Sequence, residues 1–327
     1  LHTDVIVEIT LTVDGETGSE WSDLPDGPVV EEGGVAEVLR KGNAPSETNT
    51  TPTWGVNRNI YTYAPAAAGK LEAVSTANTG WSSGLLAWVQ GWDDATEVTV
   101  DGVTSRPYSD FTTVSATART RPSIHGDVIH SRPLPVNYGD GKVTVYYGSN
   151  DGMVRAVDAE TGRERWAFVA PEHFGRFQRL HDNAPLVNYP NVDPALNPLP
   201  RDYFFDGSMG LYQTADNSRV WIFLSQRRGG RMLYGFDVTN PEAPALKWRV
   251  GCPNMDNDTG CTPGFEKMGQ TWSIPRVAFL KGHSETTPVV IVGGGYDRCE
   301  DANSPTPSCG AGRKGGAMFV IDADTGA

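Results

Sequence analysis

The chain has 327 residues, of which 40 are Asp or Glu and 27 are Lys or Arg, so its formal net charge is −13. This acidity argues against a general nucleic-acid-binding protein, because neutralising phosphates requires clustered Lys and Arg. No apolar stretch approaches the roughly 20 residues that span a bilayer, and no signal peptide follows Leu1. We therefore expect either a cytosolic protein or an interior piece of a longer one, and we favour the piece.

The composition favours β structure, because 37 Gly and 23 Pro accompany 9 Trp, 11 Tyr and 11 Phe. Apolar and polar residues alternate over Val5–Val13, which predicts a half-buried strand. A short helix is predicted over Gly34–Lys41, and the polar stretch Lys41–Pro52 is typical of a linker. Aromatic residues resume over Trp54–Tyr63, and Leu85–Trp92 is a further apolar segment.

A pattern of strand, turn, strand, Asp-containing turn and Trp-containing strand recurs in the second half of the chain. Asp158 and Trp166 mark the first copy, Asp237 and Trp248 the second, and Asp322 the third, which stops before a Trp strand. The copies lie at Val143–Val169, Val220–Val250 and, with an interruption, Val289–Ala327. Repeated antiparallel units of this kind predict the blades of a β-propeller.

The spacing of the repeat leaves two interpretations open. Asp158, Asp237 and Asp322 are 79 and 85 residues apart, nearly twice the usual propeller repeat of about 40–50 residues. Each interval holds either a second, degenerate blade or long inserts, and the Pro-rich stretch 188–201 favours inserts. The unfinished third copy makes us expect that the chain ends inside a blade.

The four cysteines form two close pairs, Cys252 with Cys261 and Cys299 with Cys309. Neither pair has the spacing of a zinc or redox motif. We favour two disulfides, each within one loop, over four free buried thiols. Disulfides would place the protein in an oxidising compartment.

One stretch between the cysteines resembles a cation-binding loop in its oxygen-bearing side chains. Asn254, Asp256 and Asp258 alternate as ligands of hard cations do. However, Thr259 occupies the place where such loops have Gly, and Glu266 lies one residue beyond the closing position. We therefore favour a solvated, disulfide-bonded turn over a metal site.

The remaining candidates have structural interpretations that we prefer. Trp166 and Trp248 are expected to pack between neighbouring blades instead of stacking on a cofactor. The repeated Asp residues are expected to accept backbone hydrogen bonds in turns. His125 and His130 are five residues apart, which on a strand would place them on opposite faces, so we do not expect them to share a metal. The basic run Arg227–Arg231 could hold an anionic partner, but a solvated turn is favoured.

The order of several short motifs resembles that of the PilC/PilY family of type IV pilus tip proteins. The repeat A-x-D-x-x-T-G-x-x-x-W at 156–166 resembles the blade signature of quinoprotein-type propellers, which both enzymes and binding proteins use, whereas the surrounding motifs are more specific. They are WGVNRNIYTY at 54–63, the apolar segment 86–91, HGDVIHSRP at 125–133, GSNDGM at 148–153, GFDVTNP at 235–241 and GGGY at 293–296.

The resemblance implies an all-β, quinoprotein-like (PilC/PilY-type) β-propeller, incomplete in this chain and with long loop inserts. Residues 46–327 would be its blades, and residues 1–45 the tail of a preceding region. The family resemblance further implies a secreted, non-catalytic protein at the pilus tip that serves pilus biogenesis and adhesion. Its partners would be minor pilins and a host or abiotic surface ligand. A calcium loop is expected beyond Ala327.

The alternative is an enzyme, a periplasmic quinone (PQQ)-dependent dehydrogenase, because such enzymes share the blade repeat. They resemble one another in an adjacent Cys-Cys pair beside the cofactor, and no two cysteines are adjacent here. In addition, Asp237 is followed by Val238-Thr239-Asn240-Pro241 instead of a Thr-Gly turn. We therefore favour the pilus protein.

Overall fold

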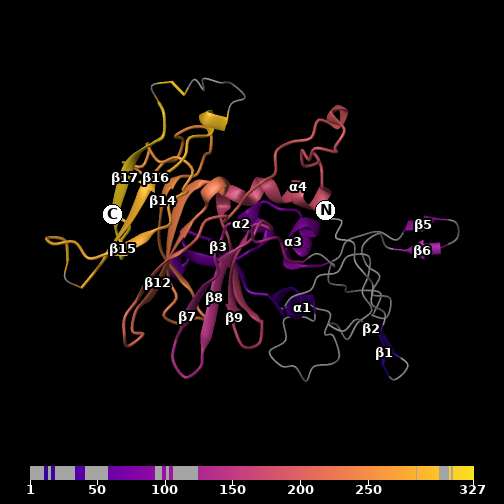
Figure 1. The fold of residues 1–327 in the computed structure, drawn as a ribbon, viewed down its shortest axis with the longest axis horizontal. Helices are drawn as coiled ribbons and strands as arrows, with labels where there is room; N and C mark the ends of the chain where they lie inside the picture. Colours follow the sequence, from indigo (N-terminus) through magenta and orange to yellow (C-terminus); the bar gives the residue numbers. More distant parts are fainter. Residues whose placement is uncertain are drawn as a thin grey trace.

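The computed structural model describes residues 11–13, 16–18, 34–40, 58–92, 98–100, 103–105, 124–284, 286–301, 309–310 and 312–327. Within these residues the protein consists mainly of β-sheets with few and short helices (Figure 1). The predicted predominance of β structure is confirmed. A closed propeller is not observed, because the described strands form separate open sheets.

The strands are β1 (Leu11–Val13), β2 (Glu16–Gly18), β3 (Ile60–Tyr63), β4 (Leu71–Ala73), β5 (Val98–Val100), β6 (Val103–Ser105), β7 (Leu134–Asn137), β8 (Val143–Gly148), β9 (Met153–Asp158), β10 (Glu164–Val169), β11 (Gly210–Gln213), β12 (Val220–Ser225), β13 (Arg231–Asp237), β14 (Ala245–Cys252), β15 (Arg276–Ala278), β16 (Val289–Gly294) and β17 (Gly315–Asp322). The α-helices are α1 (Gly34–Arg40), α2 (Thr76–Thr79), α3 (Ser83–Gln90) and α4 (Phe177–Asp182). The 3-10 helices are η1 (Ala68–Lys70), η2 (Pro171–Arg176), η3 (Pro194–Leu196), η4 (Arg227–Gly229) and η5 (Arg298–Asp301).

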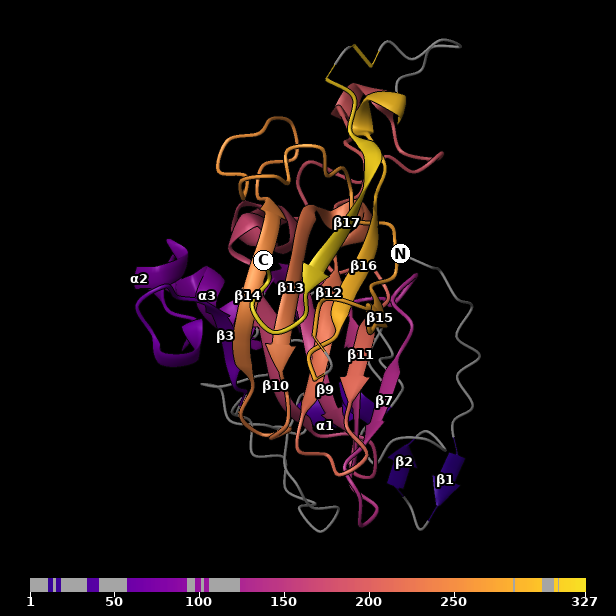
Figure 2. The same cartoon turned by 90° about the vertical axis from the view of Figure 1, so that its left-hand side faces the viewer.

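Three larger sheets follow one another along the chain. Their strand orders are β4-β3-β10-β9-β8-β7, β11-β12-β13-β14 and β15-β16-β17. All neighbouring strands within them are antiparallel except β3 and β10, which are parallel. Figure 2 shows the second sheet in front of the first, and the third sheet, nearest the viewer, overlapping the second. The smaller pairs β1–β2 and β5–β6 are two-stranded.

The second sheet is buried on both faces, because the other two sheets cover it. Along β12, Val220, Ile222 and Leu224 pack against the first sheet. The alternate residues Trp221 and Phe223 pack against the third sheet. Successive side chains of a strand point to opposite faces, so a strand with apolar residues at every position, such as VWIFLS, belongs between two layers.

A helical layer covers the outer face of the first sheet. Leu85 and Val89 of α3 and Phe177 of α4 pack with Ile60 of β3 and Val169 of β10 in one buried cluster. In Figure 1 α2, α3 and α4 lie together on this side of the molecule. Among the helices that the structure describes, none is both long and apolar enough to cross a membrane.

The predicted strand pattern agrees with the structure in most of its parts. The first copy corresponds to β8, β9 and β10, the second to β12, β13 and β14, and the third to β16 and β17. Each sheet also has a preceding short strand, β7, β11 or β15, that we did not predict. The first interval between repeat aspartates, residues 158–237, is described without a gap. It contains no additional sheet between the first and the second, so this long interval contains inserts and not a degenerate blade.

Some predictions concern residues that the structure does not describe. Of the predicted strand Val5–Val13, only Leu11–Val13 is described, as β1. The predicted linker Lys41–Pro52 and Trp54 lie outside the described residues. The predicted helix at 34–41 corresponds to α1. Leu85–Trp92, which we did not assign to a helix, largely belongs to α3.

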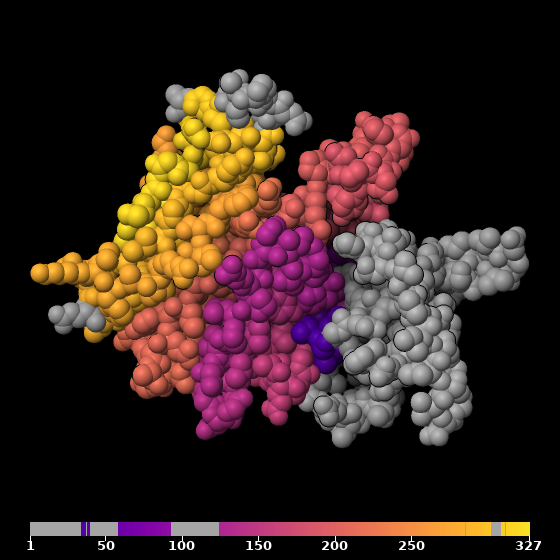
Figure 3. Space-filling model, in the orientation of Figure 1, coloured from indigo at the N-terminus to yellow at the C-terminus, as the bar shows by residue number. Residues whose placement is uncertain are grey.

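Figure 3 shows two projections from the body of the molecule. One, coloured salmon, belongs to the insert between α4 and β11, and the other, coloured orange, to the connection between β15 and β16. Both carry exposed apolar side chains, namely Tyr189, Leu196 and Leu199 in the first and Phe279 and Leu280 in the second. Inserts of this kind vary the surface without changing the sheets.

Candidate functional site

The two repeat tryptophans join neighbouring sheets. Trp166 of β10 donates a hydrogen bond from Nε1 to the carbonyl of Pro241, 2.9 Å away beyond β13 in the second sheet. Trp248 of β14 donates in the same way to Ala323, 3.0 Å away at the end of β17. The Trp166 ring also stacks on Phe236 at 6.1 Å between centroids. The geometry is that of side chains packed between layers, as the sequence predicted for these positions.

An ion pair accompanies each of these tryptophans at the equivalent place. Arg165, directly before Trp166, contacts Glu242, and Lys247, directly before Trp248, contacts Asp324. The acceptors follow Pro241 and Ala323 in the sequence, so each sheet meets the next through the same combination of aromatic ring, hydrogen bond and ion pair. Partly exposed pairs of this kind contribute little free energy, roughly 0–1 kcal/mol each.

The repeat aspartates are turn residues. Asp158 accepts the backbone N–H groups of Glu160 and Thr161, each at 3.0 Å. Asp322 accepts those of Asp324 and Thr325, and Asp237 accepts that of Thr239. Each carboxylate thus stabilises the tight turn that follows its strand.

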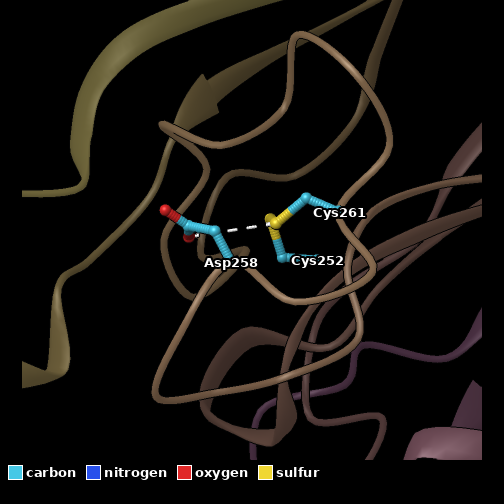
Figure 4. A group of neighbouring side chains, drawn as sticks. All are labelled: Cys252, Asp258 and Cys261. Atoms are coloured by element: carbon cyan, nitrogen blue, oxygen red, sulfur yellow. Dashed lines mark hydrogen bonds between the residues drawn. A yellow bond between two sulfur atoms is a disulfide. The ribbon is translucent and has the colours of Figure 1, made fainter.

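The structure contains both disulfides, Cys252–Cys261 and Cys299–Cys309. Cys252 is the last residue of β14 and is buried, so the first disulfide fixes the following loop to the sheet. Figure 4 shows Asp258 beside this disulfide, with 3.8 Å between its Oδ1 and Cys261 Sγ. A disulfide sulfur has no hydrogen to donate, and it is not a thiolate that could bind a metal.

The loop with the candidate cation ligands Asn254, Asp256 and Asp258 is organised around basic side chains. The buried guanidinium of Arg231 donates to the carbonyls of Asn254 and Asn257 and to the carboxylate of Asp258. The Nζ of Lys314 lies 2.6 Å from the same carboxylate. These contacts hold the pKa of Asp258 below its usual value, with the hydrogen bond from Lys314 contributing most.

The other two residues of this candidate site are also engaged. The side chain of Asn254 accepts the backbone N–H of Asp256 at 2.9 Å. The carboxylate of Asp256 is exposed and pairs with Arg298 at 2.8 Å. A metal ion at this loop would have to compete with Arg231 and Lys314 for Asp258. Asn254, Asp256 and Asp258 stay untested candidates for a metal site, and the solvated turn stays the favoured prediction.

Reducing the disulfides is expected to lower the melting temperature by several degrees without loss of sheet content. Each closes a short loop and should contribute about 2–3 kcal/mol by restricting the unfolded chain. Thermal unfolding followed by circular dichroism, with and without reductant, measures this. A variant with all four cysteines replaced by Ala is the control, because its melting temperature should not respond to reductant. An unchanged melting temperature of the wild type would contradict the prediction.

A network of buried charges lies within the first sheet, beside the start of β3. Glu164 on β10 receives hydrogen bonds from Arg58 at 2.7 Å and from Arg155 at 2.9 Å, and all three side chains are fully buried. Arg155 also pairs with Asp151 at 2.6 Å. Burial favours the protonated form of Glu164, but the charges of Arg58 and Arg155 outweigh it and hold its pKa below the ordinary value.

His125 and His130, which the sequence analysis considered as metal ligands, have separate environments. His125 contacts the Tyr147 hydroxyl at 2.8 Å through Nε2. Burial and then the charge of Arg155 lower the pKa of His125 to about 4, so its ring is neutral at pH 7. His130 contacts Asp206 at 2.8 Å through Nδ1. The structure does not bring the two rings to one site.

The basic run Arg227–Arg231 divides into an inward and an outward part. Arg231 is buried in the disulfide loop, as described above. Arg227 and Arg228 lie over the ring of Trp272, with their guanidinium carbons 4.3 and 5.0 Å from its centroid. Sequence reasoning gave Trp272 no role, because it lies more than 40 residues from the run and carries no motif of its own.

Comparisons with known proteins bear on the identity of the chain. No protein-family model matches it. It is 28% identical over 207 residues to the type IV pilus biogenesis factor PilY1 of Pseudomonas aeruginosa strain UCBPP-PA14, which covers 56% of this chain and 16% of that protein. The resemblance to the PilC/PilY family is confirmed. A PilY1 homolog of Xylella fastidiosa strain Temecula1 is 28% identical over 210 residues, covering 56% of this chain and 15% of that protein.

A solved structure of a PilY1 domain is also similar to this chain. The crystal structure of the PilY1 C-terminal domain of Pseudomonas aeruginosa superposes with a TM-score of 0.36 and 24% identity, over 57% of this chain and 29% of that one. This superposition is too limited to assign an architecture. The chain spans about a sixth of the length of the curated PilY1 relatives that it matches.

Proposed function

We propose that the protein serves type IV pilus biogenesis as a non-catalytic assembly and surface-binding protein, a tip adhesin. The observation that supports this most is the similarity to proteins named type IV pilus biogenesis factor PilY1. Minor pilins at the pilus tip and a host or abiotic surface ligand are its proposed partners. Its proposed location is the cell surface, reached through the periplasm, where disulfides such as the two in this structure persist.

We further propose that residues 46–327 are blades of a β-propeller and that residues 1–45 are the tail of a preceding region. Two four-strand units, β7–β10 and β11–β14, and the equivalent Trp contacts between sheets support the propeller. A rigid arrangement of this kind suits a protein under mechanical load, because interlocked sheets unfold slowly. The long inserts supply exposed loops for binding. Calcium is proposed only at a loop beyond Ala327.

Immunogold labelling of intact cells and of sheared pili, with an antibody raised against this chain, tests the proposal. We expect gold at filament ends, and cells that lack the gene are the control. Label confined to the soluble periplasmic fraction would contradict a pilus protein. The quinone-dependent dehydrogenase would then be tested by reconstitution with quinone and calcium and by dye-linked alcohol oxidation.

A further inference from the structure

A cluster of basic and aromatic side chains lies at one end of the second sheet. Arg227 and Arg228, in the turn between β12 and β13, both lie over Trp272. The guanidinium carbon of Arg228 is also 5.7 Å from the ring centroid of Tyr203. The ring of Tyr296 packs against that of Trp272, with 5.4 Å between the two centroids. We call these five residues the arginine–aromatic surface.

Hydrogen bonds from η2 hold the turn that carries the two arginines. The carbonyl of Gly229 accepts hydrogen bonds from Arg176 at 2.8 Å and from the buried His173 at 3.2 Å. Because a carbonyl only accepts, His173 Nε2 carries the hydrogen. Arg176 also donates to the carbonyl of Tyr203 and so ties the Tyr203 segment to the turn. A Cβ at Gly229 would lie 1.6 Å from the carbonyl oxygen of Phe204, so only glycine allows this approach.

A fully buried carboxylate lies beneath the same turn. The side chain of Asp206 has no exposed surface and contacts His130 at 2.8 Å and Arg227 at 3.9 Å. A buried carboxylate has to be paired and hydrogen-bonded, and Asp206 contacts both Arg227 and the partly exposed His130. Arg227 keeps this place in spite of a left-handed backbone with φ 49°, a conformation that costs about 1–2 kcal/mol for a residue other than glycine.

Arg228 has unsatisfied donors. It is exposed, and among the described residues no acceptor lies within hydrogen-bond distance of its guanidinium group. Its position is nevertheless fixed by Trp272 and Tyr203, which reduces the conformational entropy that binding would cost. A fixed guanidinium with free N–H groups matches a planar carboxylate, which it can hold through two parallel hydrogen bonds.

The half-buried ring of Tyr203 lies beside Arg228, and the half-buried ring of Tyr296 lies beside Trp272. Tyr rings offer rigid, amphipathic contact area at low entropic cost. A carboxylated sugar presents both groups that this surface would recognise, a carboxylate for the arginines and a pyranose ring whose apolar C–H face can pack on the tyrosines. An acidic peptide or inorganic phosphate would use the arginines alone.

We propose that the arginine–aromatic surface binds uronate units of acidic polysaccharides. The inference deepens the surface-binding function proposed above and rests on it for its biological setting. Because the whole chain carries a net charge of −13, long polyanions are repelled elsewhere on the protein. A short oligomer is therefore the appropriate probe.

Titration calorimetry of the purified protein with trigalacturonate at low salt tests the proposal. We expect Arg228→Ala to weaken binding about tenfold or more, as loss of a charge-assisted pair does. Arg228→Lys keeps the charge but loses the planar donor pair, so it should recover only part of the affinity. The matched control is Arg219→Ala, which removes an exposed arginine at the opposite end of β12 and should change the affinity less than twofold.

Three results would overturn the proposal. The first is no binding of trigalacturonate, and the second is an unchanged affinity in Arg228→Ala. The third is equal affinity for triglutamate or inorganic phosphate, which would make this a general anion surface. Neutral trigalactose should bind far more weakly than trigalacturonate. Failure of pilus labelling would not change these affinities, so the two proposals fail separately.

Discussion

Replacing Trp166 by Ala is expected to reduce the free energy of unfolding by about 3–5 kcal/mol, the range for deleting a large buried aromatic side chain. The indole is fully buried between the first two sheets and stacks on Phe236 of the second. Its removal would leave a cavity at the contact between the layers and an unpaired carbonyl at Pro241. Urea unfolding followed by circular dichroism measures the change.

The hydrogen bond can be separated from the packing by a pair of Phe variants. Trp166→Phe removes an Nε1–H that donates to Pro241, whereas Trp221→Phe removes a buried Nε1–H that has no partner among the described residues. Both rings are almost fully buried. We expect Trp166→Phe to cost about 1–2 kcal/mol more, because it leaves a buried acceptor unpaired. Equal costs would show that the hydrogen bond does not stabilise the contact between sheets.

The longer strands of each sheet could be predicted from the sequence because two local signals coincide there. Apolar runs such as VWIFLS at β12 are bounded by turn residues, and the Asp-containing turns recur in register. The short strands β7, β11 and β15 carry neither signal. In β7 and β15 most side chains are at least partly exposed, so their pairing depends on the neighbouring strand.

The helices over the first sheet were missed although local signals mark their ends. Ser75 and Ser82 cap the first turns of α2 and α3, and Gly80 and Gly91 end them in left-handed conformations. Both Ser residues accept a backbone N–H three positions later, as N-caps do. The helices have 4 and 8 residues, too few for apolar periodicity to be recognised.

The candidate site residues divide in the same way. The disulfide pairs and the turn aspartates were predicted from short spacings along the chain. The partners of Arg231 and Arg228 could not be predicted, because Asp258, Trp272 and Tyr203 reach them from other segments. All three arginines of the run Arg227–Arg231 are equally basic in the sequence, but the structure buries Arg231 on β13 and leaves Arg227 partly exposed and Arg228 exposed in the preceding turn.

The buried charges of the first sheet depend on one another. Arg58 and Arg155 share Glu164, and Arg155 also holds Asp151. Removing one partner of a buried ion pair leaves an uncompensated charge and costs about 3–5 kcal/mol. Arg58 lies two residues before β3, so the network also helps to fix that strand, which pairs in parallel with β10.

Glu164→Gln is therefore expected to destabilise the protein by about 3–5 kcal/mol at neutral pH. Because the pKa of Glu164 is lower in the folded state than its ordinary value of 4.5, the carboxylate stabilises the fold above that pH, and this contribution is lost as the pH falls through the lower, folded-state value. The difference in unfolding free energy between wild type and variant should thus be largest at pH 7 and shrink as the pH falls below 4.5. Urea unfolding at a series of pH values measures it.

Glu242→Gln is the matched control, because Glu242 also contacts two arginines, Arg163 and Arg165, but its side chain is 47% exposed. Solvent screens exposed ion pairs, so this variant should cost no more than about 1 kcal/mol. If both Gln variants cost the same at pH 7, burial does not account for the strength of the Glu164 network. A loss that is large for Glu164 and small for Glu242 would instead show that a desolvated charge helps to hold β3 against β10 within the first sheet.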